Sequence, residues 1–520
     1  MRRIKPSTVA SISRYYRTSP IAALRRSPCL LLPRNRHYCS SPHDSTPHPP
    51  SFQDGPTPTA PTTPVASNTN TTTTNINKTL HHSLATQLDI YDIHPYSPGS
   101  PLFLPNGARI FNRLIEFLRA QYALYGYEEV ITPMIYKDKL WEQSGHLKNF
   151  RDDMFKVISG KKQPQNATST ETEGDAEEYS LKPMNCPGHC LLYKMRNHGY
   201  TELPIRFAEF ASLHRDEIKS ALTGLTRVRR FHQDDAHIFC RPDQIAQEIS
   251  STLEMIDTVY STFALTSYKF VLSTRPANFI GTVEEWDEAE TALKWSLEKS
   301  NKEWSLNPGD GAFYGPKIDI ILTDSTGKEH QTATVQLDFQ LPQNFELGYQ
   351  TAESGVLAKP VIIHRAVFGS LERFMALLIE RYGKRWPFWI SPRQVAIVPV
   401  NSSEEIMQYV REVRERLAGV GDSFCVPQEG DVGMRRQELG KRTFVVDVEP
   451  AGVGKGLKLA KEKGYNVVLV IGNNEAKTGT VTCDIWRGGK SGMYARAETP
   501  IKVEELYELL VKMEREYRYD

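Results

Sequence analysis

Four strand-like runs between residues 205 and 342 constrain the fold of this chain more than any other feature. They follow one another with few helical segments between them, and they read IRFAEFASLHRDE, TRVRRFHQDDAHIF, KIDIILTD and ATVQLDFQLP. Before them, an apolar pattern with helical period starts at residue 106, and the short β-branched run EEVITPMI then predicts a strand that Pro133 stops. The helical segment GSLERFMALLIERYG follows them. Consecutive strands with so few intervening helices predict an α+β fold, in which helices pack on a largely antiparallel sheet.

The pattern changes after residue 390. The run VAIVPV, a helical segment near residues 403–418, the runs NVVLVIG and TVTCDI, and a terminal helix alternate along the chain. This alternation is typical of an α/β domain. A chain of 520 residues is also too long for a single core. We therefore expect one domain at residues 80–390 and a second at residues 391–520.

The start of the chain has a different composition. Residues 1–38 carry nine of the 63 Lys and Arg residues and no acidic residue. An arginine-rich, acid-free start predicts a mitochondrial presequence over residues 1–40 and a location in the mitochondrial matrix; a basic arm that binds nucleic acid is the alternative. Residues 41–79 are rich in Pro, Thr and Asn, which predicts a disordered linker. Without the presequence, 54 basic residues face 62 acidic ones, so nucleic acid would have to bind at local basic patches.

The composition and spacing also exclude several classes of protein. No run approaches 18 consecutive apolar residues, so the sequence predicts no transmembrane helix and no membrane partner. Seven cysteines without a repeated C-x2-C spacing argue against a disulfide framework and against a paired-cysteine zinc module. The segment AGVGKG at residues 451–456 lacks the Ser or Thr that follows the lysine of a P-loop. A nucleotide would need another binding device.

The segment KPMNCPGH at residues 182–189 holds Cys186 between two prolines and next to a glycine. The nearest cysteine, Cys190, gives only a C-x3-C spacing, which is not a local metal motif. A free cysteine is usually a small buried hydrophobe. This segment alone therefore leaves both a structural and a functional role open.

Arginines are concentrated at residues 204–239, on or beside two of the strand-like runs. Positions two apart in a strand share a face, so we expect Arg227, Arg229 and the aromatic Phe231 to lie together, with Arg215 on the paired strand. Converging guanidinium groups suit a polyphosphate, which they bind through paired hydrogen bonds. A solvated strand face with scattered charges is the alternative.

These segments resemble a known family. FAEFASLHRDE and RVRRFHQDDAHIF resemble motif 2 of the class II aminoacyl-tRNA synthetases, HRAVFGSLERFMALLIE resembles motif 3, and GYEEVITPM resembles motif 1. KPMNCPGH, QDDAHIFC, AFYGPKIDI and TVQLDFQLP are similar to threonyl-tRNA synthetases in particular. The resemblance implies a class II antiparallel catalytic domain, a homodimer formed through motif 1, and an α/β anticodon-binding domain after residue 390.

The implied reaction is the ATP-dependent activation of threonine to threonyl adenylate, followed by transfer of threonine to the 3′ end of mitochondrial tRNA(Thr).

The resemblance also implies a catalytic Zn²⁺ held by Cys186, His237 and His364. One thiolate and two imidazoles suit zinc and leave a coordination position open. Threonine would offer its amine and hydroxyl to the metal, whereas valine lacks the hydroxyl.

Serine lacks only a methyl group, worth ~1–3 kcal/mol of discrimination, so serine is the expected error. Members of the family often carry an N-terminal editing domain that removes such errors. The residues before position 80 are accounted for as presequence and linker, so we expect no editing domain here.

The resemblance assigns further residues to the substrates. Arg215 would hold the α-phosphate of ATP and stabilise the charge that develops there. Arg373 would contact the γ-phosphate and one face of the adenine, with Phe231 on the other face. The other implied ligands are Glu217, Arg227 and Gln331 for ATP and its Mg²⁺, and Met184, Asp235, Tyr314 and Gln336 for threonine, with Asp235 taking the ammonium group. His146 would help to move a proton from the tRNA hydroxyl, although a surface role is the alternative.

Two rival functions are a class II synthetase for proline or serine and an inactive relative that only binds tRNA. The Cys186, His237 and His364 set argues against the first, and the intact Arg215 and Arg373 argue against the second.

The chain departs from the family pattern at three places. Arg230 stands where glycine is usual, the loop at residues 159–179 is longer than usual, and Asp484 lies in a strand that is often basic.

Overall fold

The computed structural model describes residues 79–158, 178–300, 302–323, 327–418, 443–488 and 492–517. The predicted presequence, the predicted linker up to residue 78 and residues 159–177 of the long loop lie outside these ranges. Within them, no helix has both the length and the apolar content needed to cross a membrane.

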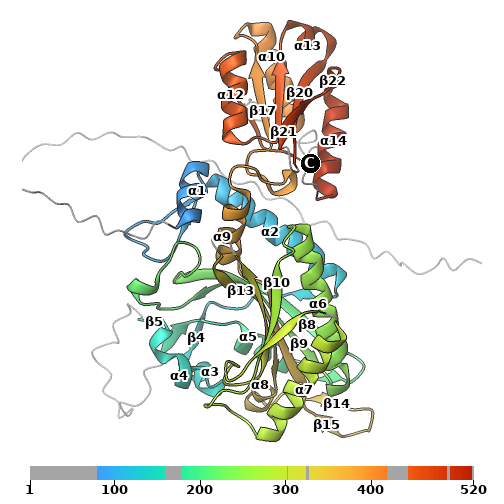
Figure 1. Cartoon of the computed structure of the whole chain (residues 1–520). Coiled ribbons are helices and arrows are strands. Elements are labelled where there is room, and N and C mark those ends of the chain that lie inside the picture. Colours follow the sequence, from blue (N-terminus) through green and yellow to red (C-terminus); the bar gives the residue numbers. More distant parts are fainter. Residues whose placement is uncertain are drawn as a thin grey trace, which may run out of the picture. The chain divides into compact units, whose positions relative to one another are not determined.

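The first large element is an eight-stranded sheet (Figure 1). Its order is β11 (Trp304–Asn307), β10 (Tyr268–Ser273), β12 (Lys317–Thr323), β13 (Glu329–Asp338), β16 (Val361–Ser370), β9 (Arg230–Cys240), β8 (Ile205–His214) and β3 (Glu128–Glu129). All neighbours are antiparallel except the outer pairs β10–β11 and β3–β8. The predicted antiparallel sheet flanked by helices is therefore confirmed.

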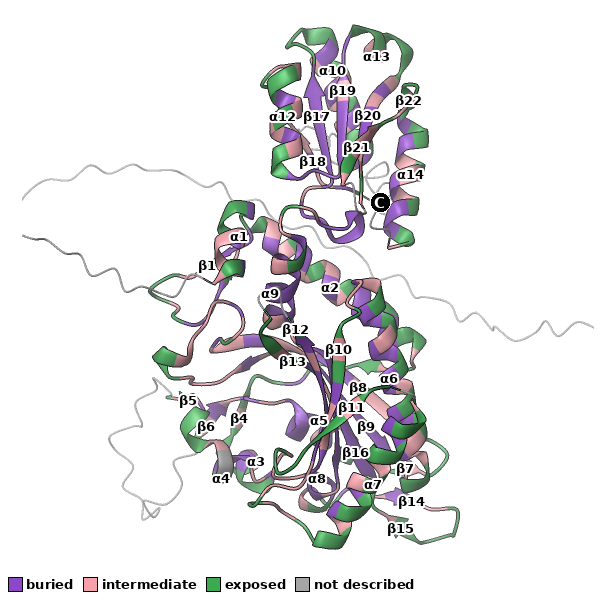
Figure 2. Ribbon diagram, viewed as in Figure 1, coloured by how far each residue is buried: buried purple, intermediate pink, exposed green. Residues whose placement is uncertain are grey.

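Helices bury one face of this sheet in a single large apolar core. The main ones are α2 (Pro105–Leu124), α6 (Ile245–Thr262), α7 (Val283–Lys299) and α9 (Leu371–Tyr382). Proline at the first position of α2 suits a helix start, because its missing N–H would have no partner there. In Figure 2, α6 and α7 turn buried residues toward the sheet and exposed residues away from it, whereas α9 is buried along almost its whole length.

The remaining elements of this part of the chain are short. The helices are α1 (Leu80–Leu88), α3 (Asp138–Gln143), α4 (His146–Phe150), α5 (Cys186–Lys194) and α8 (Gln340–Asn344). The strands are β1 (Tyr91–Asp92), β2 (Leu102–Phe103), β4 (Ile135–Lys137), β5 (Lys156–Val157), β6 (Tyr179–Leu181), β7 (His198–Gly199), β14 (Tyr349–Gln350) and β15 (Leu357–Ala358). The strand expected at EEVITPMI before Pro133 is present only in part, because β3 covers only Glu128–Glu129 and β4 begins after Pro133. A proline has no N–H to donate to a sheet.

The second large sheet is mixed. Its order is β18 (Val446–Val448), β17 (Val395–Pro399), β19 (Val467–Ile471), β20 (Thr480–Arg487) and β21 (Met493–Arg496), and β22 (Ile501–Lys502) also pairs with β20. The first three strands are parallel, and helices α10 (Glu404–Ala418), α12 (Val453–Lys463), α13 (Asn473–Thr478) and α14 (Val503–Arg515) alternate with strands. The predicted α/β fold is confirmed. The domain limits near residues 80 and 390 stay predictions.

The two unusual features of the second sheet have structural explanations. The segment AGVGKG forms the start of α12, with Gly452 directly before the helix, and it does not form a P-loop. Asp484 is buried in β20, where its carboxylate accepts hydrogen bonds from Lys461 (2.7 Å) and Arg496 (2.8 Å). Although burial opposes ionisation, these two cations lower the pKa of Asp484 below its usual value. The acid in this strand therefore stabilises the fold by pairing with neighbouring bases.

Asp234 fixes the end of strand β16 from the neighbouring strand β9. Its carboxylate accepts hydrogen bonds from the backbone N–H groups of Val367 (2.7 Å) and Phe368 (2.9 Å), and it lies 3.7 Å from the guanidinium of the equally buried Arg365. At this point the register with β9 shifts and β16 bends toward α9. Gly369 is required at the bend, since its φ is +71° and a Cβ would lie 2.3 Å from the carbonyl oxygen of Thr332.

We expect Asp234→Ala to lower the free energy of unfolding by ~3–5 kcal/mol, because it leaves the buried guanidinium of Arg365 without its counter-ion and two buried N–H groups without their acceptor. Urea unfolding of the full chain measures the loss. Glu329→Ala is the control, since Glu329 forms an exposed ion pair with Lys269 and such pairs are worth less than ~1 kcal/mol. Equal losses in the two variants would contradict this assignment.

Candidate functional site

The register of the eight-stranded sheet brings two rows of mostly polar residues together on one face. Directly paired residues of neighbouring strands point to the same side of a sheet, as do residues two positions apart. The first row consists of Lys317, Gln336, His364, His237 and Phe207, taken across β12, β13, β16, β9 and β8. The second row consists of Asp319, Thr334, Ala366, Asp235 and Glu209. Residues far apart in the sequence therefore share one site.

A pocket of about 420 Å³ lies on this face, and we call it the arginine pocket. Its lining includes the six residues that the sequence assigned to ATP, namely Arg215, Glu217, Arg227, Phe231, Gln331 and Arg373. Arg215 follows β8, Phe231 belongs to β9, and Arg373 lies in the first turn of α9. The loop between β8 and β9 supplies Glu217 and Arg227.

The guanidinium groups in the arginine pocket are held by neutral or acidic partners. Arg373 donates to the carbonyl oxygens of Thr226 (3.2 Å) and Gln331 (3.0 Å), and Arg227 donates to Glu217 (2.9 Å). Burial lowers the pKa of Arg373, and repulsion by Arg215 and Arg227 lowers it further. Three cations that repel one another across a pocket favour binding of a multiply charged anion there.

A smaller pocket of about 130 Å³ adjoins the first, and we call it the small pocket. The four residues assigned to threonine, namely Met184, Asp235, Tyr314 and Gln336, all line it together with Cys186 and His364. The two pockets share Arg215, Gln233, Thr334 and Ala366 in their linings. A group bound in one pocket can therefore meet a group bound in the other beside the guanidinium of Arg215.

Cys186, His237 and His364 are buried and can place one ligand atom each within 4.8 Å of the others. His364 donates from Nε2 to the buried carboxylate of Asp338 (2.9 Å), which leaves the lone pair of Nδ1 available. Among the described residues, the buried Nε2 of His237 has no hydrogen-bond partner. One thiol and two ring nitrogens with available lone pairs match the donor set of a zinc site.

A second layer fixes the orientation of His237. Its Nδ1 lies 2.8 Å from Nδ1 of His189, and Nε2 of His189 lies 3.2 Å from the carboxylate of Glu209. Since a carboxylate accepts, His189 donates from Nε2 and accepts at Nδ1, so His237 must donate from Nδ1. Glu209 also accepts from Lys182 and from the Thr132 N–H, and all five side chains are buried. This chain of hydrogen bonds directs the free Nε2 of His237 toward Cys186 and His364.

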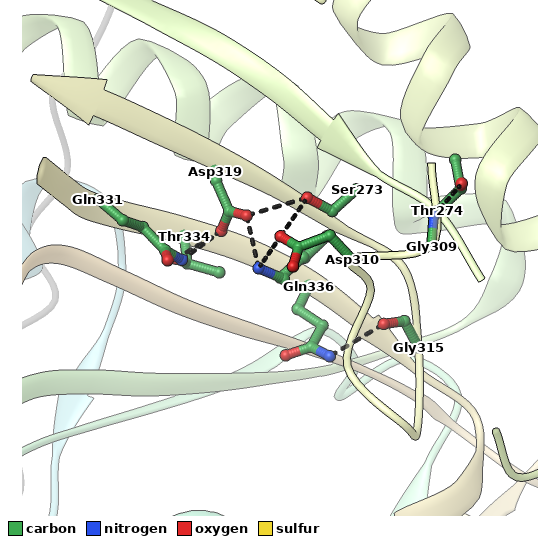
Figure 3. A network of polar contacts seen from close by, with 10 residues as sticks. Ser273, Thr274, Gly309, Asp310, Gly315, Asp319, Gln331, Thr334 and Gln336 are labelled. Atoms are coloured by element: carbon green, nitrogen blue, oxygen red, sulfur yellow. Dashed lines mark hydrogen bonds and ion pairs between the residues drawn. The ribbon is translucent and has the colours of Figure 1, made fainter. Parts of the chain in front are cut away.

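Asp319 organises the edge of both pockets from β12 (Figure 3). Its buried carboxylate accepts hydrogen bonds from Gln331, Thr334 (3.1 Å), Ser273 (3.1 Å) and Lys317 (2.6 Å). Gln331 lines the arginine pocket, and Thr334 lines both pockets. The same close-up shows Gln336 donating to the carbonyl oxygen of Gly315 (3.1 Å), next to Tyr314.

His146 lies near the site without lining either pocket. It begins α4, it is buried, and its Nδ1 lies 2.8 Å from Oγ of Ser144. Burial lowers the pKa of His146 to about 4, so the ring is neutral at pH 7. Its Nε2 has no hydrogen-bond partner within the part of the chain that the structure describes. The expected surface alternative is wrong, but the structure does not test the expected proton transfer.

The structure corrects the expected strand face of arginines. Strand β9 begins only at Arg230, so Arg227 and Arg229 belong to the loop before it. Arg229 donates to the carbonyl oxygen of Glu217 (2.8 Å) and does not line the arginine pocket. Arg230 likewise donates to Oγ of Ser212 (2.9 Å) and lies outside the lining. The loop turns instead through Gly224, and this turn brings Arg227 back over the pocket.

Sequence reasoning missed several residues of the site. Thr334 and Ala366 lie two positions from Gln336 and His364, so strand alternation alone could have placed them beside those residues. His189 lies three residues after Cys186 in α5 and was read only as part of a motif. Asp319 and Glu209 gave no sequence signal, since their roles depend on partners brought in by the sheet register.

Comparison with known proteins identifies relatives of both parts of the chain. Residues 169–382 match the model of the tRNA synthetase class II core domain (G, H, P, S and T), and residues 394–512 match that of the anticodon binding domain. The probable mitochondrial threonine–tRNA ligase of Schizosaccharomyces pombe is 46% identical over 405 residues, covering 76% of this chain and 82% of that protein. The mitochondrial threonine–tRNA ligase of Saccharomyces cerevisiae is 45% identical over 412 residues, covering 77% and 85%.

Among solved structures, the RNA binding domain of threonyl-tRNA synthetase from Cryptosporidium parvum is similar, with a TM-score of 0.71 and 39% identity. The match covers 83% of this chain and 98% of that one. Cytoplasmic threonine–tRNA ligases match as well, for example that of Caenorhabditis elegans at 45% identity. This chain spans only half the length of that cytoplasmic relative.

Proposed function

Because this chain belongs to the threonine–tRNA ligases, a family of class II aminoacyl-tRNA synthetases, we propose that its two adjoining pockets hold the two substrates of threonine activation. The chain joins threonine to tRNA at the expense of ATP, which is used with Mg²⁺. In our assignment, ATP occupies the arginine pocket and threonine occupies the small pocket. The shared lining of the two pockets at Arg215 carries this proposal.

The first step forms threonyl adenylate at this shared lining. The threonine carboxylate attacks the α-phosphorus of ATP, the bond to the bridging oxygen of the β-phosphate breaks, and pyrophosphate leaves. Arg215 faces both pockets and would bind the α-phosphate, where negative charge develops in the transition state. Arg227 and Arg373 would bind the departing phosphates, with Glu217 and Gln331 as further ligands of the nucleotide and its Mg²⁺. Phe231 would stack on the adenine.

Threonine would be oriented by residues of the small pocket. Asp235 would take the ammonium group, while Met184, Tyr314 and Gln336 would shape the remaining space. Cys186, His237 and His364 would hold Zn²⁺ through the thiolate, Nε2 and Nδ1, respectively, the atoms that their hydrogen bonds leave available. A bound zinc ion supplies an open coordination position that amine and hydroxyl groups can fill. His146, neutral at pH 7, would accept the proton of the tRNA hydroxyl in the second step.

Amino-acid-dependent ATP–pyrophosphate exchange tests the substrate assignment. We expect exchange with threonine, weaker exchange with serine and none with valine or proline, because only the first two offer both an amine and a hydroxyl group. Arg215→Ala should lower the exchange rate by ~10²–10³, as expected for loss of a charge that stabilises the transition state. Exchange with proline alone would contradict the substrate. No exchange with any amino acid would favour a chain that only binds tRNA.

Metal content tests the zinc assignment separately. We expect about one zinc ion per chain in the wild type and none in Cys186→Ala, because two imidazoles alone do not complete the site. Cys190→Ala is the matched control, since Cys190 is equally buried one turn later in α5 and lies outside the metal set. Elemental analysis of the purified full chain measures both. Zinc retained in Cys186→Ala, or lost equally in both variants, would reject the assignment.

We also propose that the chain forms a homodimer through the edge of the sheet at β3. This short strand ends the eight-stranded sheet, and the exposed apolar side chains of Leu124, Ile131 and Met134 flank it. Ile131 is 90% exposed and Leu124 is 78% exposed. A second copy of the chain would cover these side chains and pair with the open strand edge.

Charge introduced at this edge should dissociate the dimer. We expect the double variant Leu124→Asp, Ile131→Asp to run as a monomer in size-exclusion chromatography with light scattering, because a buried carboxylate without a partner opposes association. Leu357→Asp in β15 is the control, since Leu357 is 67% exposed in a different sheet. A monomeric wild type, or a dimer in the double variant, would contradict the proposal.

Finally, we propose that residues 1–40 direct the chain to the mitochondrial matrix. Support comes from their basic, acid-free composition and from the similarity to two mitochondrial ligases, although cytoplasmic relatives match as well. A fluorescent protein fused to residues 1–78 should enter mitochondria, and replacing the arginines of residues 1–38 by glutamine should abolish import. A fusion that stays in the cytosol would contradict this location.

A further inference from the structure

His81, the second residue of α1, connects three segments that are far apart in the sequence. Its side chain is buried, with an exposed fraction of only 2%. Nδ1 lies 2.9 Å from the carboxylate of Glu380 in α9, and the backbone N–H of Leu225 lies 3.2 Å from Nε2. Leu225 belongs to the loop between β8 and β9, which also contains Glu217 and Arg227 of the arginine pocket.

The partners of His81 determine its protonation state. The N–H of Leu225 can only donate, so Nε2 must accept, and the ring proton therefore lies on Nδ1 and is donated to Glu380. The hydroxyl of Thr79 also lies 3.0 Å from Nε2 and can share this acceptor. Glu380 further accepts from the backbone N–H of His81, which satisfies one of the free donors at the start of α1.

The loop is shaped to approach this histidine closely. Gly224 has a φ of +46°, and a Cβ at this position would lie 2.1 Å from Nε2 of His81. Only glycine therefore allows the peptide group before Leu225 to reach the ring. The side chain of Leu225 is fully buried in the same core as Ala85 and Leu88 of α1. Apolar packing sets the position of the loop tip, and the hydrogen bond to His81 sets the orientation of its peptide group.

The orientation of this peptide group directly affects the residues that line the arginine pocket. The carbonyl oxygen of Thr226, one residue further along, accepts the hydrogen bond from Nε of Arg373 (3.2 Å). The next residue is Arg227, which is paired with Glu217. Glu380 and Arg373 lie on the same helix, α9, seven residues apart and therefore on one face. The N-terminal helix thus contacts both the loop and the helix that supply the arginines.

We propose that His81 is a positioning residue for ATP: by accepting the hydrogen bond of Leu225 it holds the β8–β9 loop in the conformation that presents Glu217 and Arg227 to the nucleotide and supports Arg373. This inference rests on the proposed assignment of the arginine pocket to ATP. It makes α1 part of the framework of the nucleotide site. The small pocket is lined by strand residues, by Cys186 of α5, by Met184 and Tyr314, and by Arg215 at the start of this loop. The loop tip at Thr226 and Arg227 does not line it, so we expect His81 not to influence threonine binding.

Two substitutions separate the two hydrogen bonds of the ring. In His81→Gln the amide oxygen can take the place of Nε2 and accept from Leu225, whereas in His81→Asn the amide nitrogen can take the place of Nδ1 and donate to Glu380. We expect His81→Asn to raise the KM for ATP about 3–10-fold in pyrophosphate exchange, the effect of one hydrogen bond, with the KM for threonine unchanged. His81→Gln should restore the KM for ATP to within about twofold of the wild type.

A second measurement reports on the loop itself. Hydrogen–deuterium exchange of the peptide at residues 222–228 should accelerate in His81→Asn and not in His81→Gln. His82→Asn is the matched control, because His82 is the next residue of α1 and its Nδ1 lies 3.3 Å from the hydroxyl of Tyr91. It should change neither quantity.

The outcomes distinguish the inference from its alternatives. If His81→Gln is impaired and His81→Asn is normal, the bond to Glu380 matters and His81 only attaches α1. If the KM values for ATP and threonine rise together, the role is structural. An unchanged KM for ATP in His81→Asn, together with the expected loss of exchange in Arg215→Ala, would reject the role of His81. The assignment of the arginine pocket to ATP would then still stand. Normal exchange in Arg215→Ala would instead reject the assignment of the pocket to ATP.

Discussion

The buried carboxylate of Asp234 determines where β16 stops being a regular strand, and the functional site depends on that point. Its two hydrogen bonds to the backbone at Val367 and Phe368 occur where the register with β9 shifts. Before the shift, β16 contributes His364 and Ala366 to the small pocket. After it, the chain turns through Gly369 into α9, which carries Arg373 into the arginine pocket. One carboxylate therefore sets the spacing between the part of β16 that lines the small pocket and the helix that lines the arginine pocket.

The face of the sheet opposite to Asp234 shows how little local sequence is needed to assemble two adjoining pockets. Each strand contributes only one or two polar side chains to the two rows, and the hydrogen-bond ladder between strands assembles them. Buried carboxylates then fix the orientation of side chains on this face through hydrogen bonds. Glu209 bonds to His189, and Asp338 bonds to His364. Asp319 bonds to Gln331 and Thr334. The carboxylate of Glu217 holds Arg227 in the same way, whereas backbone carbonyl oxygens hold Arg373.

Sequence reasoning predicted the fold class, and the residues it assigned to ATP and to threonine line the two pockets beside others that it missed. These results came by two different routes. Periodicity was sufficient for the long strands and for α2 and α9, whose apolar patterns are strong. It predicted too long a strand at EEVITPMI, where β3 covers only Glu128–Glu129. It failed at Arg227 and Arg229, because a loop through Gly224 replaced the expected strand. The metal set came from family resemblance alone, since Cys186, His237 and His364 meet only through the register of three elements. Contacts such as that of His81 with Leu225 depend on tertiary packing and carry no signal in the sequence.

The two rows of side chains also limit how such a chain can change during evolution. Along a strand, neighbouring residues face opposite sides, so the loss or gain of one residue within β13 would turn Gln336 and Thr334 toward the helices and bring their neighbours into the pockets. A substitution, by contrast, alters one position and leaves the others in register. New amino-acid specificity is therefore accessible by point substitution on this face, while changes in length are confined to the connections between strands. Relatives of this chain should align without gaps through β8, β9, β13 and β16, however different their loops become.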